Sequence, residues 1–149
     1  MKNRLNDAFI VSRYTGFLTI SAVTVFELAL KTIFCDFATR KNKVLGTFCE
    51  KYFEKINGKI KFKDIKENYL PKFGSKYTKR FASKIDKIEL FELKKNGISV
   101  KASYGNIVTW RHNFAHQGIL PDNASYSEAK RGYESGKIIM ECLSECMRH

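Results

Sequence analysis

Apolar residues recur at helical spacing along almost the whole chain. The pattern predicts a helix near residues 4–14, a break or bend at Thr15-Gly16, and a second, longer helix over residues 17–39. In this longer segment apolar side chains occupy every side, and several are β-branched, which is also typical of strands. Its length favours a helix that is buried in a core or in an interface.

The rest of the chain predicts shorter helices separated by turn residues. The expected segments are 44–56, a short amphipathic piece over 61–69, a helix over 76–95, a helix ending at Gln117-Gly118, and a last helix capped by Ser125 or Ser127. Residues 98–102 alternate weakly and are expected to form a connector. Asn96-Gly97 and Gly118 suit the left-handed position after a helix end. The prediction is therefore an all-α, up-and-down bundle of about five main helices.

Length and composition fit one folded domain, residues 1–149. The chain has 149 residues, of which 44% are hydrophobic and two are proline. The longest uncharged apolar stretch, Tyr14–Phe26, covers 13 residues, whereas a membrane-spanning helix needs about 20. Charges at Asp7 and Arg13 interrupt what would be the apolar region of a secretory signal. We therefore expect a cytoplasmic protein without a membrane partner.

Four cysteines, Cys35, Cys49, Cys142 and Cys146, are expected to be free thiols in a reducing compartment. Cys142 and Cys146 are four residues apart and could share a ligand on one helix. The chain contains no Cys-x-x-Cys pair, so we interpret them as ordinary core cysteines. No metal and no cofactor are predicted.

The positive charge is concentrated in the middle of the chain. The net charge is +12, and residues 40–101 alone carry eighteen basic and seven acidic side chains, or +11. Such a block favours a polyanionic partner, either nucleic acid or an anionic membrane, and the uneven distribution favours nucleic acid. Lysines account for 20 of the 27 basic residues, so codon bias is an alternative explanation.

The chemistry-bearing residues gather in Trp-Arg-His-Asn-Phe-Ala-His-Gln-Gly, residues 110–118, on an otherwise apolar helix. At about 100° per residue, Arg111 and His116 are roughly 140° apart around the helix axis and would flank a groove. His112 and His116 share one face at a spacing of four residues, and Asn113 is also close to His116.

Three interpretations of this segment compete. A His-x-x-x-His pair can bind zinc, although Asn113 occupies the position of the glutamate that zinc proteases use, and no third ligand is evident. A histidine at a helix end can also be purely structural. The third interpretation is phosphoryl chemistry on RNA, because imidazole transfers protons near neutral pH and arginine binds phosphate oxygens with a planar fork. RNA supplies its own nucleophile, the 2′-hydroxyl.

The stretch Arg111-His112-Asn113-Phe114-Ala115-His116 resembles the Arg-x4-6-His motif of the HEPN superfamily, and Ala-His-Gln-Gly is similar to its frequent Ala-His-Gly ending. Gly118 stands where a toxin subgroup partnered with nucleotidyltransferases has tyrosine. The sequence is therefore identified as closer to the RiboL-PSP-like subgroup. The resemblance implies a HEPN-like helical fold and a metal-independent endoribonuclease with Arg111 and His116 as catalytic residues, supported by His112 and Asn113.

The resemblance also implies a homodimer in which two motif helices face each other and form one composite RNA site. It implies a role as a toxin or an antiviral defence effector, with an antitoxin or a defence-system protein as a possible partner. Glu27 has two interpretations: it orients Arg111 or a histidine, or it pairs with Lys31 one turn away. The alternative function is a HEPN-fold module that binds RNA or a nucleotide, or another protein, without cutting. A basic bundle that binds DNA or a membrane surface is a third possibility.

Overall fold

The computed structural model describes residues 2–148, with side chains from Asp7 onward. Within this range the chain is helical and contains no strand, so the all-α prediction is confirmed. The elements are α1 (Lys2–Lys41), α2 (Lys43–Phe53), the π-helical segment η1 (Asp64–Tyr69), α3 (Leu70–Phe73), α4 (Ser75–Asn96), α5 (Val100–Gln117) and α6 (Tyr126–Cys146).

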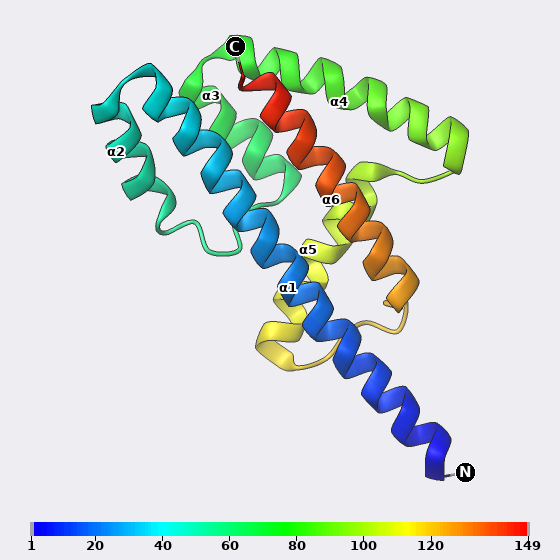
Figure 1. Ribbon diagram of the computed structural model, residues 1–149. Coiled ribbons are helices and arrows are strands. Elements are labelled where there is room, and N and C mark those ends of the chain that lie inside the picture. Colours follow the sequence, from blue (N-terminus) through cyan, green and yellow to red (C-terminus); the bar gives the residue numbers. More distant parts are fainter. Residues whose placement is uncertain (1, 149) are drawn as a thin grey trace.

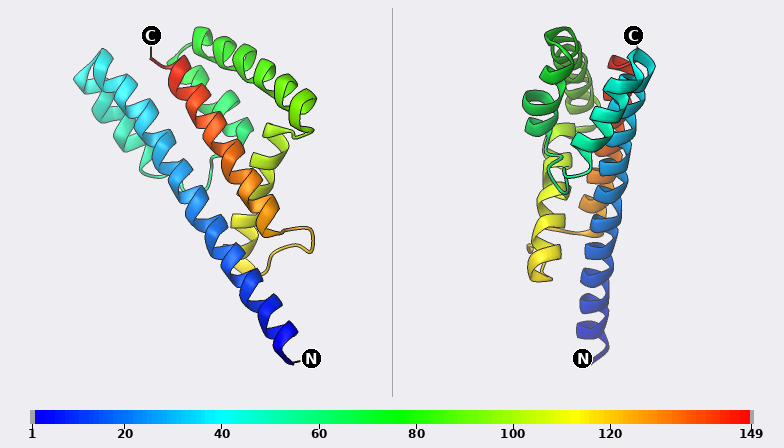
Figure 2. Two further views of the ribbon diagram at one scale, coloured as in Figure 1. Left: turned by 45° about the vertical axis from the view of Figure 1, so that its right-hand side comes forward. Right: turned by 90° about the vertical axis from the view of Figure 1, so that its left-hand side faces the viewer.

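The long helix α1 is the spine of the molecule (Figure 1). It packs against α2, α5 and α6, while α2 folds back along its carboxyl-terminal end and α4 crosses the end of the bundle near the C-terminus. The amino-terminal part of α1 extends beyond the other helices (Figure 2). The motif helix α5 therefore has α1 on one side and α6 on another.

The predicted break at Thr15-Gly16 is wrong, because α1 runs through it without interruption. The buried Thr15 hydroxyl donates a hydrogen bond to the carbonyl oxygen of Val11 within the helix, at 2.8 Å. Gly16 serves packing instead of termination: a Cβ atom there would lie 2.2 Å from the Phe114 ring. The glycine thus lets α1 and the motif helix approach closely.

The core is rich in aromatic rings. Phe34 of α1 stacks between Phe53 of α2 and Phe73 of α3, with ring centroids 5.2 and 4.8 Å away. Phe26 of α1 fits against Gly136 of α6, where a Cβ atom would meet its ring at 2.1 Å. These contacts fix α1 against α2, α3 and α6.

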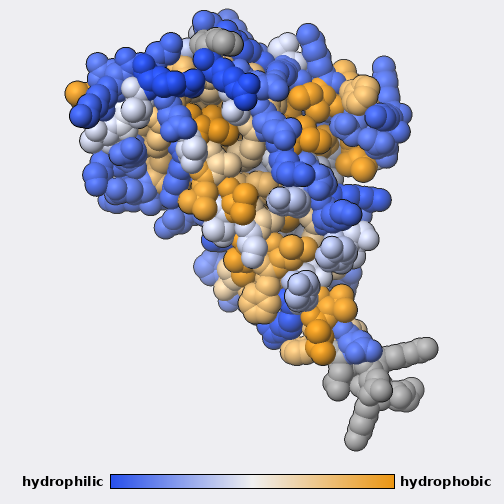
Figure 3. Space-filling model, viewed as in Figure 1, coloured by the Kyte–Doolittle hydropathy of each residue, from blue (hydrophilic) through white to orange (hydrophobic). Residues whose placement is uncertain are grey.

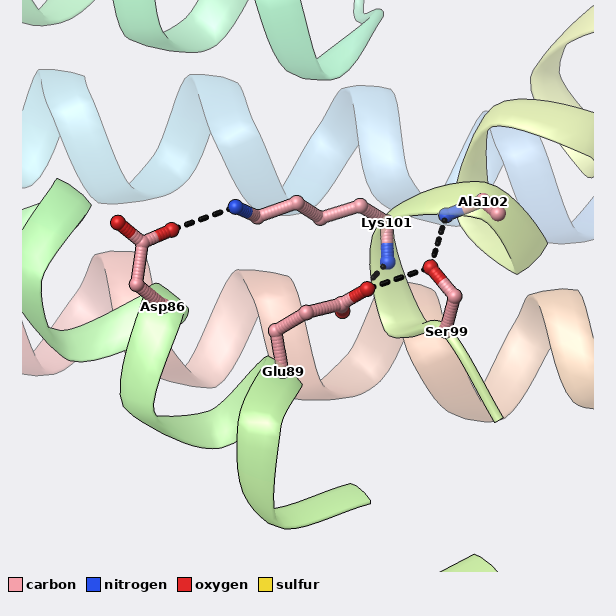
Figure 4. Close-up of polar contacts among 5 residues, drawn as sticks. All are labelled: Asp86, Glu89, Ser99, Lys101 and Ala102. Carbon is pink, nitrogen blue, oxygen red and sulfur yellow. Dashed lines mark hydrogen bonds and ion pairs between the residues drawn. The ribbon is translucent and has the colours of Figure 1, made fainter. Parts of the chain in front are cut away.

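The start of α5 is tied to α4 by a polar cluster (Figure 4). Ser99 caps the helix by accepting a hydrogen bond from the Ala102 amide at 3.1 Å, and its hydroxyl donates to Glu89. Glu89 also accepts from the Lys101 amide, and the Lys101 ammonium pairs with Asp86. The predicted connector over 98–102 is therefore too long, since this cap starts the helix at Val100.

Other helix ends follow the turn chemistry closely. Gly97 and Gly118 adopt left-handed conformations after α4 and α5, as predicted, and Ser125 rather than Ser127 caps α6. The segment predicted over 61–69 contains the π-helix η1, which continues directly into α3, and Pro71 lies in the first turn of α3.

One face of α1 is apolar and exposed. Exposed apolar side chains recur along this face every three or four residues, and the exposed Ser21 interrupts the row. The face lies opposite the buried Val23, Phe26 and Leu30. This α1 stripe consists of Ile10, Tyr14, Phe17, Val25 and Leu28. Figure 3 shows hydrophobic surface continuing down the molecule to the region where α1 leaves the bundle.

The α1 stripe bears on the earlier membrane expectation. The uncharged stretch Tyr14–Phe26 is too short to span a bilayer, but Asp7–Lys41 is long and apolar enough to cross one by length and composition alone. A core helix of a soluble protein passes the same test, and α1 packs against α2, α5 and α6. The packing therefore accounts for one face of α1 and leaves the stripe to be explained.

Candidate active site

A groove of about 350 Å³ lies between α5 and the loop that follows α2. We call it the motif groove, and its lining residues are Asn57, Gly58, Lys59, Lys61, Val108, Thr109, Arg111, His112 and His116. Both predicted catalytic residues and one of the predicted supporting residues therefore share one concave surface. Asn113, the other supporting residue on α5, is half-buried and is not among the lining residues.

The two histidines stand side by side on the solvent-facing part of α5. Their ring centroids are 4.5 Å apart, with the rings tilted by 57°. This proximity follows from their spacing of four residues, as the sequence predicted. Both side chains are exposed, so each ring can reach a molecule in the groove.

Arg111 forms a partly buried ion pair with Glu27. The Nη2 atom of Arg111 lies 3.8 Å from Oε1 of Glu27, and the side chains are only 24% and 14% exposed. The Arg111 Nε atom is buried and has no hydrogen-bond partner among the described residues. No Glu27–Lys31 ion pair forms within the described part of the chain, so the geometry favours the Arg111 interpretation of Glu27. Partial burial strengthens the attraction between these two charges.

The loop after α2 completes this arrangement through Gly58. Its backbone amide donates to Oε1 of Glu27 at 2.8 Å. Gly58 has a left-handed φ of +73°, and a Cβ atom there would lie 3.1 Å from Nη1 of Arg111. The backbone conformation therefore favours glycine, and a larger residue would also push against the guanidinium. In the sequence, Asn57-Gly58 directly follows the helix predicted over 44–56 and indicates only that this helix ends there.

Two tyrosines anchor the same loop. The hydroxyls of Tyr69 and Tyr104 donate to the carbonyl oxygens of Lys59 and Ile60, each at 2.5 Å. Burial raises the pKa of Tyr69 to about 12 and also raises the pKa of Tyr104. Both hydroxyls therefore stay protonated as donors, and the loop is fixed against η1 and α5.

The end of the motif helix is attached to the projecting part of α1. The Arg13 guanidinium donates to the carbonyl oxygen of Gly118 at 3.2 Å. Phe17 packs edge-on against Phe114, with ring centroids 5.6 Å apart. His116 thus lies near the section of α1 that carries the exposed stripe.

The two histidine and cysteine pairs that were considered as metal ligands, His112 with His116 and Cys142 with Cys146, gain no further ligand among the described residues. Among the described residues, no group of three or more histidine, cysteine, aspartate or glutamate side chains is placed to hold a metal ion. Cys49, Cys142 and Cys146 are buried and Cys35 is half-buried, as expected of core cysteines. Burial raises the pKa of Cys49 and of Cys142 to about 12, which keeps these thiols protonated and unreactive at neutral pH.

The groove therefore combines two proton-transferring rings with one fixed cation. A ring that accepts a proton and a neighbouring ring that donates one are the parts of general acid–base catalysis. The guanidinium is positioned to stabilise negative charge that develops on a bound anion. The sequence had given His112 only a supporting role, and in the structure both histidines line the groove.

Comparison with known proteins gives a family match over nearly the whole chain. A model of the RiboL-PSP-HEPN family matches residues 2–149. Neither the curated proteins nor the solved structures contained a match.

Proposed function

The chain belongs to the RiboL-PSP-HEPN family, and from this premise we propose that it is a metal-independent endoribonuclease. The observation that carries the proposal is the motif groove, where Arg111, His112 and His116 line one surface. The middle segment of the chain, with a charge of +11, supplies attraction for the RNA backbone.

The proposed reaction uses the 2′-hydroxyl of RNA as the nucleophile. One histidine takes the proton of that hydroxyl, the 2′-oxygen bonds to phosphorus, and the bond from phosphorus to the 5′-oxygen breaks. The other proton-transferring group gives a proton to the departing 5′-oxygen. His116 fills one of these roles, His112 is placed to fill the other, and Arg111 stabilises the charge on the phosphorane. The products carry a 2′,3′-cyclic phosphate and a 5′-hydroxyl.

We further propose that the working unit is a homodimer joined along the α1 stripe. The stripe lies on the part of α1 that holds the end of the motif helix through Arg13 and Phe17. A second copy seated there would bring a second His116 toward the first site. A role as a toxin or an antiviral defence effector, with an antitoxin or defence protein as partner in the cytoplasm, is proposed on the family resemblance alone.

Cleavage of a labelled single-stranded RNA by purified protein, with and without EDTA, tests the proposal. We expect cleavage to persist in EDTA, to fall about 10²- to 10⁴-fold in His116→Ala and to fall about 10²- to 10³-fold in Arg111→Ala. Gln117→Ala, an exposed neighbour of His116, and Arg131→Ala, an arginine on α6, are matched controls that should keep full activity.

Each contrary result points to a different function. Loss of cleavage in EDTA would restore the metal interpretation of His112 and His116. Tight RNA binding without any cleavage would favour the non-catalytic HEPN-fold module. Retained biological activity in the Arg111→Ala and His116→Ala variants would favour a basic bundle whose motif plays no part.

A further inference from the structure

Two more hollows adjoin the motif groove and form a series with it. The first, here called the lysine trough, measures about 580 Å³ and shares Lys59 with the motif groove. The second, the aromatic pocket, measures about 330 Å³ and shares Tyr52 and Lys72 with the lysine trough. Because neighbouring hollows share these side chains, the three lie next to one another in a row, here called the path.

The lysine trough is strongly basic. Its walls include Lys51, Lys55, Lys59 and Lys72. Asp64 is the one acid among the described residues that line it, and its carboxylate already accepts hydrogen bonds from the Lys61 amide and the Asn68 side chain. Lys51 forms an ion pair with Glu54 at 3.0 Å, whereas Lys55, Lys59 and Lys72 have no acidic partner among the described residues. The trough therefore presents excess positive charge to an extended anion.

The aromatic pocket combines flat apolar walls with a charged rim. Phe37, Phe73 and Tyr77 contribute to its walls, and Phe48 stands at its edge with 67% of its surface exposed. Because most of the Phe48 side chain is exposed where it lines the pocket, its ring is accessible to a ligand. The rim lysines are Lys41, above the Phe37 ring at 5.4 Å, and Lys72, above the Tyr52 ring at 5.7 Å.

We propose that this path is the track of a single-stranded RNA substrate, with its backbone in the lysine trough and one unstacked base in the aromatic pocket. The proposal rests on the ribonuclease function and adds a substrate-binding subsite remote from the motif. Single-stranded RNA is a chain of anions that carries a flat aromatic group at each unit, and proteins bind it by alternating cationic and aromatic contacts. Lysines suit this task as adaptable point charges, without fixing the sequence that is bound.

The lysines around the pocket favour RNA as its occupant over an apolar protein segment. A hydrophobic helix or strand would cover the aromatic walls but would leave the rim lysines and the adjoining trough without counter-charges. RNA satisfies the pocket and the trough together, and its strand continues toward the histidines of the motif groove.

The test measures binding of a fluorescent single-stranded RNA of about twelve nucleotides, a length within the usual range for such sites. It uses His116→Ala protein, which is expected to cleave this RNA about 10²- to 10⁴-fold more slowly. Adding Phe48→Ala should weaken the affinity about tenfold, the size of one lost base–aromatic stack. Phe91→Ala is the matched control, because Phe91 is a similarly exposed phenylalanine, at 57%, that lies beneath Lys95 on α4 and lines none of the three hollows. It should leave the affinity unchanged.

A second measurement uses the otherwise unmodified enzyme and separates the two proposals. Phe48→Ala should lower kcat/KM for the long RNA and leave it unchanged for a dinucleotide, which is too short to reach the aromatic pocket. Absence of all cleavage would defeat the ribonuclease function, whereas the binding comparison would still report on the track. Equal effects of the Phe48 and Phe91 changes would overturn the track, as would a change in oligomeric state on Phe48→Ala, which would assign the pocket to a second copy of the chain.

Discussion

Glu27 is the residue that joins the parts of the candidate site. One carboxylate oxygen faces the Arg111 guanidinium and accepts the Gly58 amide, so a residue of α1 connects the loop after α2 to the motif helix. We regard it as a positioning residue, because it acts on substrate through Arg111. Glutamine at this position has the same shape without the charge and keeps an oxygen that can accept the Gly58 amide. It therefore allows the effect of the charge to be measured separately from that of the hydrogen bond.

Glu27→Gln should therefore reduce cleavage while leaving the fold intact. The glutamine oxygen can still accept the Gly58 amide, but the negative charge beneath Arg111 is lost. We expect kcat to fall about tenfold, equivalent to about 1.4 kcal/mol, with KM and Tm nearly unchanged. Glu27→Ala should also lower Tm, since the Gly58 amide then loses its partner. Full activity in Glu27→Gln would show that the charge of Glu27 does not act on Arg111.

At this scale the sequence predicted the side chains of α5 and missed the loop. The four-residue spacing placed His112 beside His116, because helical geometry is local and independent of the rest of the fold. The pairing of Glu27 with Arg111 spans 84 positions, and no local pattern could decide between Arg111 and Lys31. The role of Gly58 at the guanidinium depends on the same tertiary contact.

At the scale of elements, the caps were the most predictable feature and interruptions within helices the least. Ser125, Gly97 and Gly118 have local roles that their residue types reveal directly. Thr15-Gly16 gave the same turn signal in sequence, yet the Phe114 ring occupies the space beside Gly16 and favours a continuous helix. Tertiary packing thus overrode a weak local preference.

The continuous α1 makes the dimer testable by a single charge. Leu28 is 60% exposed on the α1 stripe, so Leu28→Asp should leave the subunit folded but place a carboxylate in the proposed interface. We expect the dimer dissociation constant to rise at least about hundredfold, because an unpaired charge is costly to bury. Analytical ultracentrifugation measures this change.

Leu90→Asp is the control for that experiment, since Leu90 is 59% exposed on α4, away from the stripe. It should leave the association unchanged. Equal association of both variants with the unmodified protein would place the interface elsewhere. A monomeric protein that binds lipid vesicles through the stripe would instead assign α1 to a membrane.

At the scale of the whole molecule, the excess positive charge and the motif lie in different segments of the chain. The motif lies in residues 102–149, which are neutral overall, while the +11 segment, residues 40–101, forms α2, η1, α3, α4 and their loops. Composition alone revealed this excess but not its shape. The fold places Lys51, Lys55, Lys59 and Lys72 around one trough that leads to the motif groove, and this convergence depends on contacts between distant elements.

A focused trough and a diffuse positive field predict different salt dependence. If Lys55 contacts one phosphate in the trough, Lys55→Gln should reduce the slope of log affinity against log salt concentration by about 0.7, the counterion release for one contact on a single strand. Lys87→Gln removes the same charge from the exposed surface of α4, outside the three hollows, and should leave the slope nearly unchanged. Fluorescence titrations of single-stranded RNA between about 50 and 200 mM salt measure both slopes.

Equal reductions would mean that the positive charge attracts RNA only as a general field, because position would then not matter. A loss confined to Lys55→Gln would mean that the phosphates follow the trough toward His112 and His116.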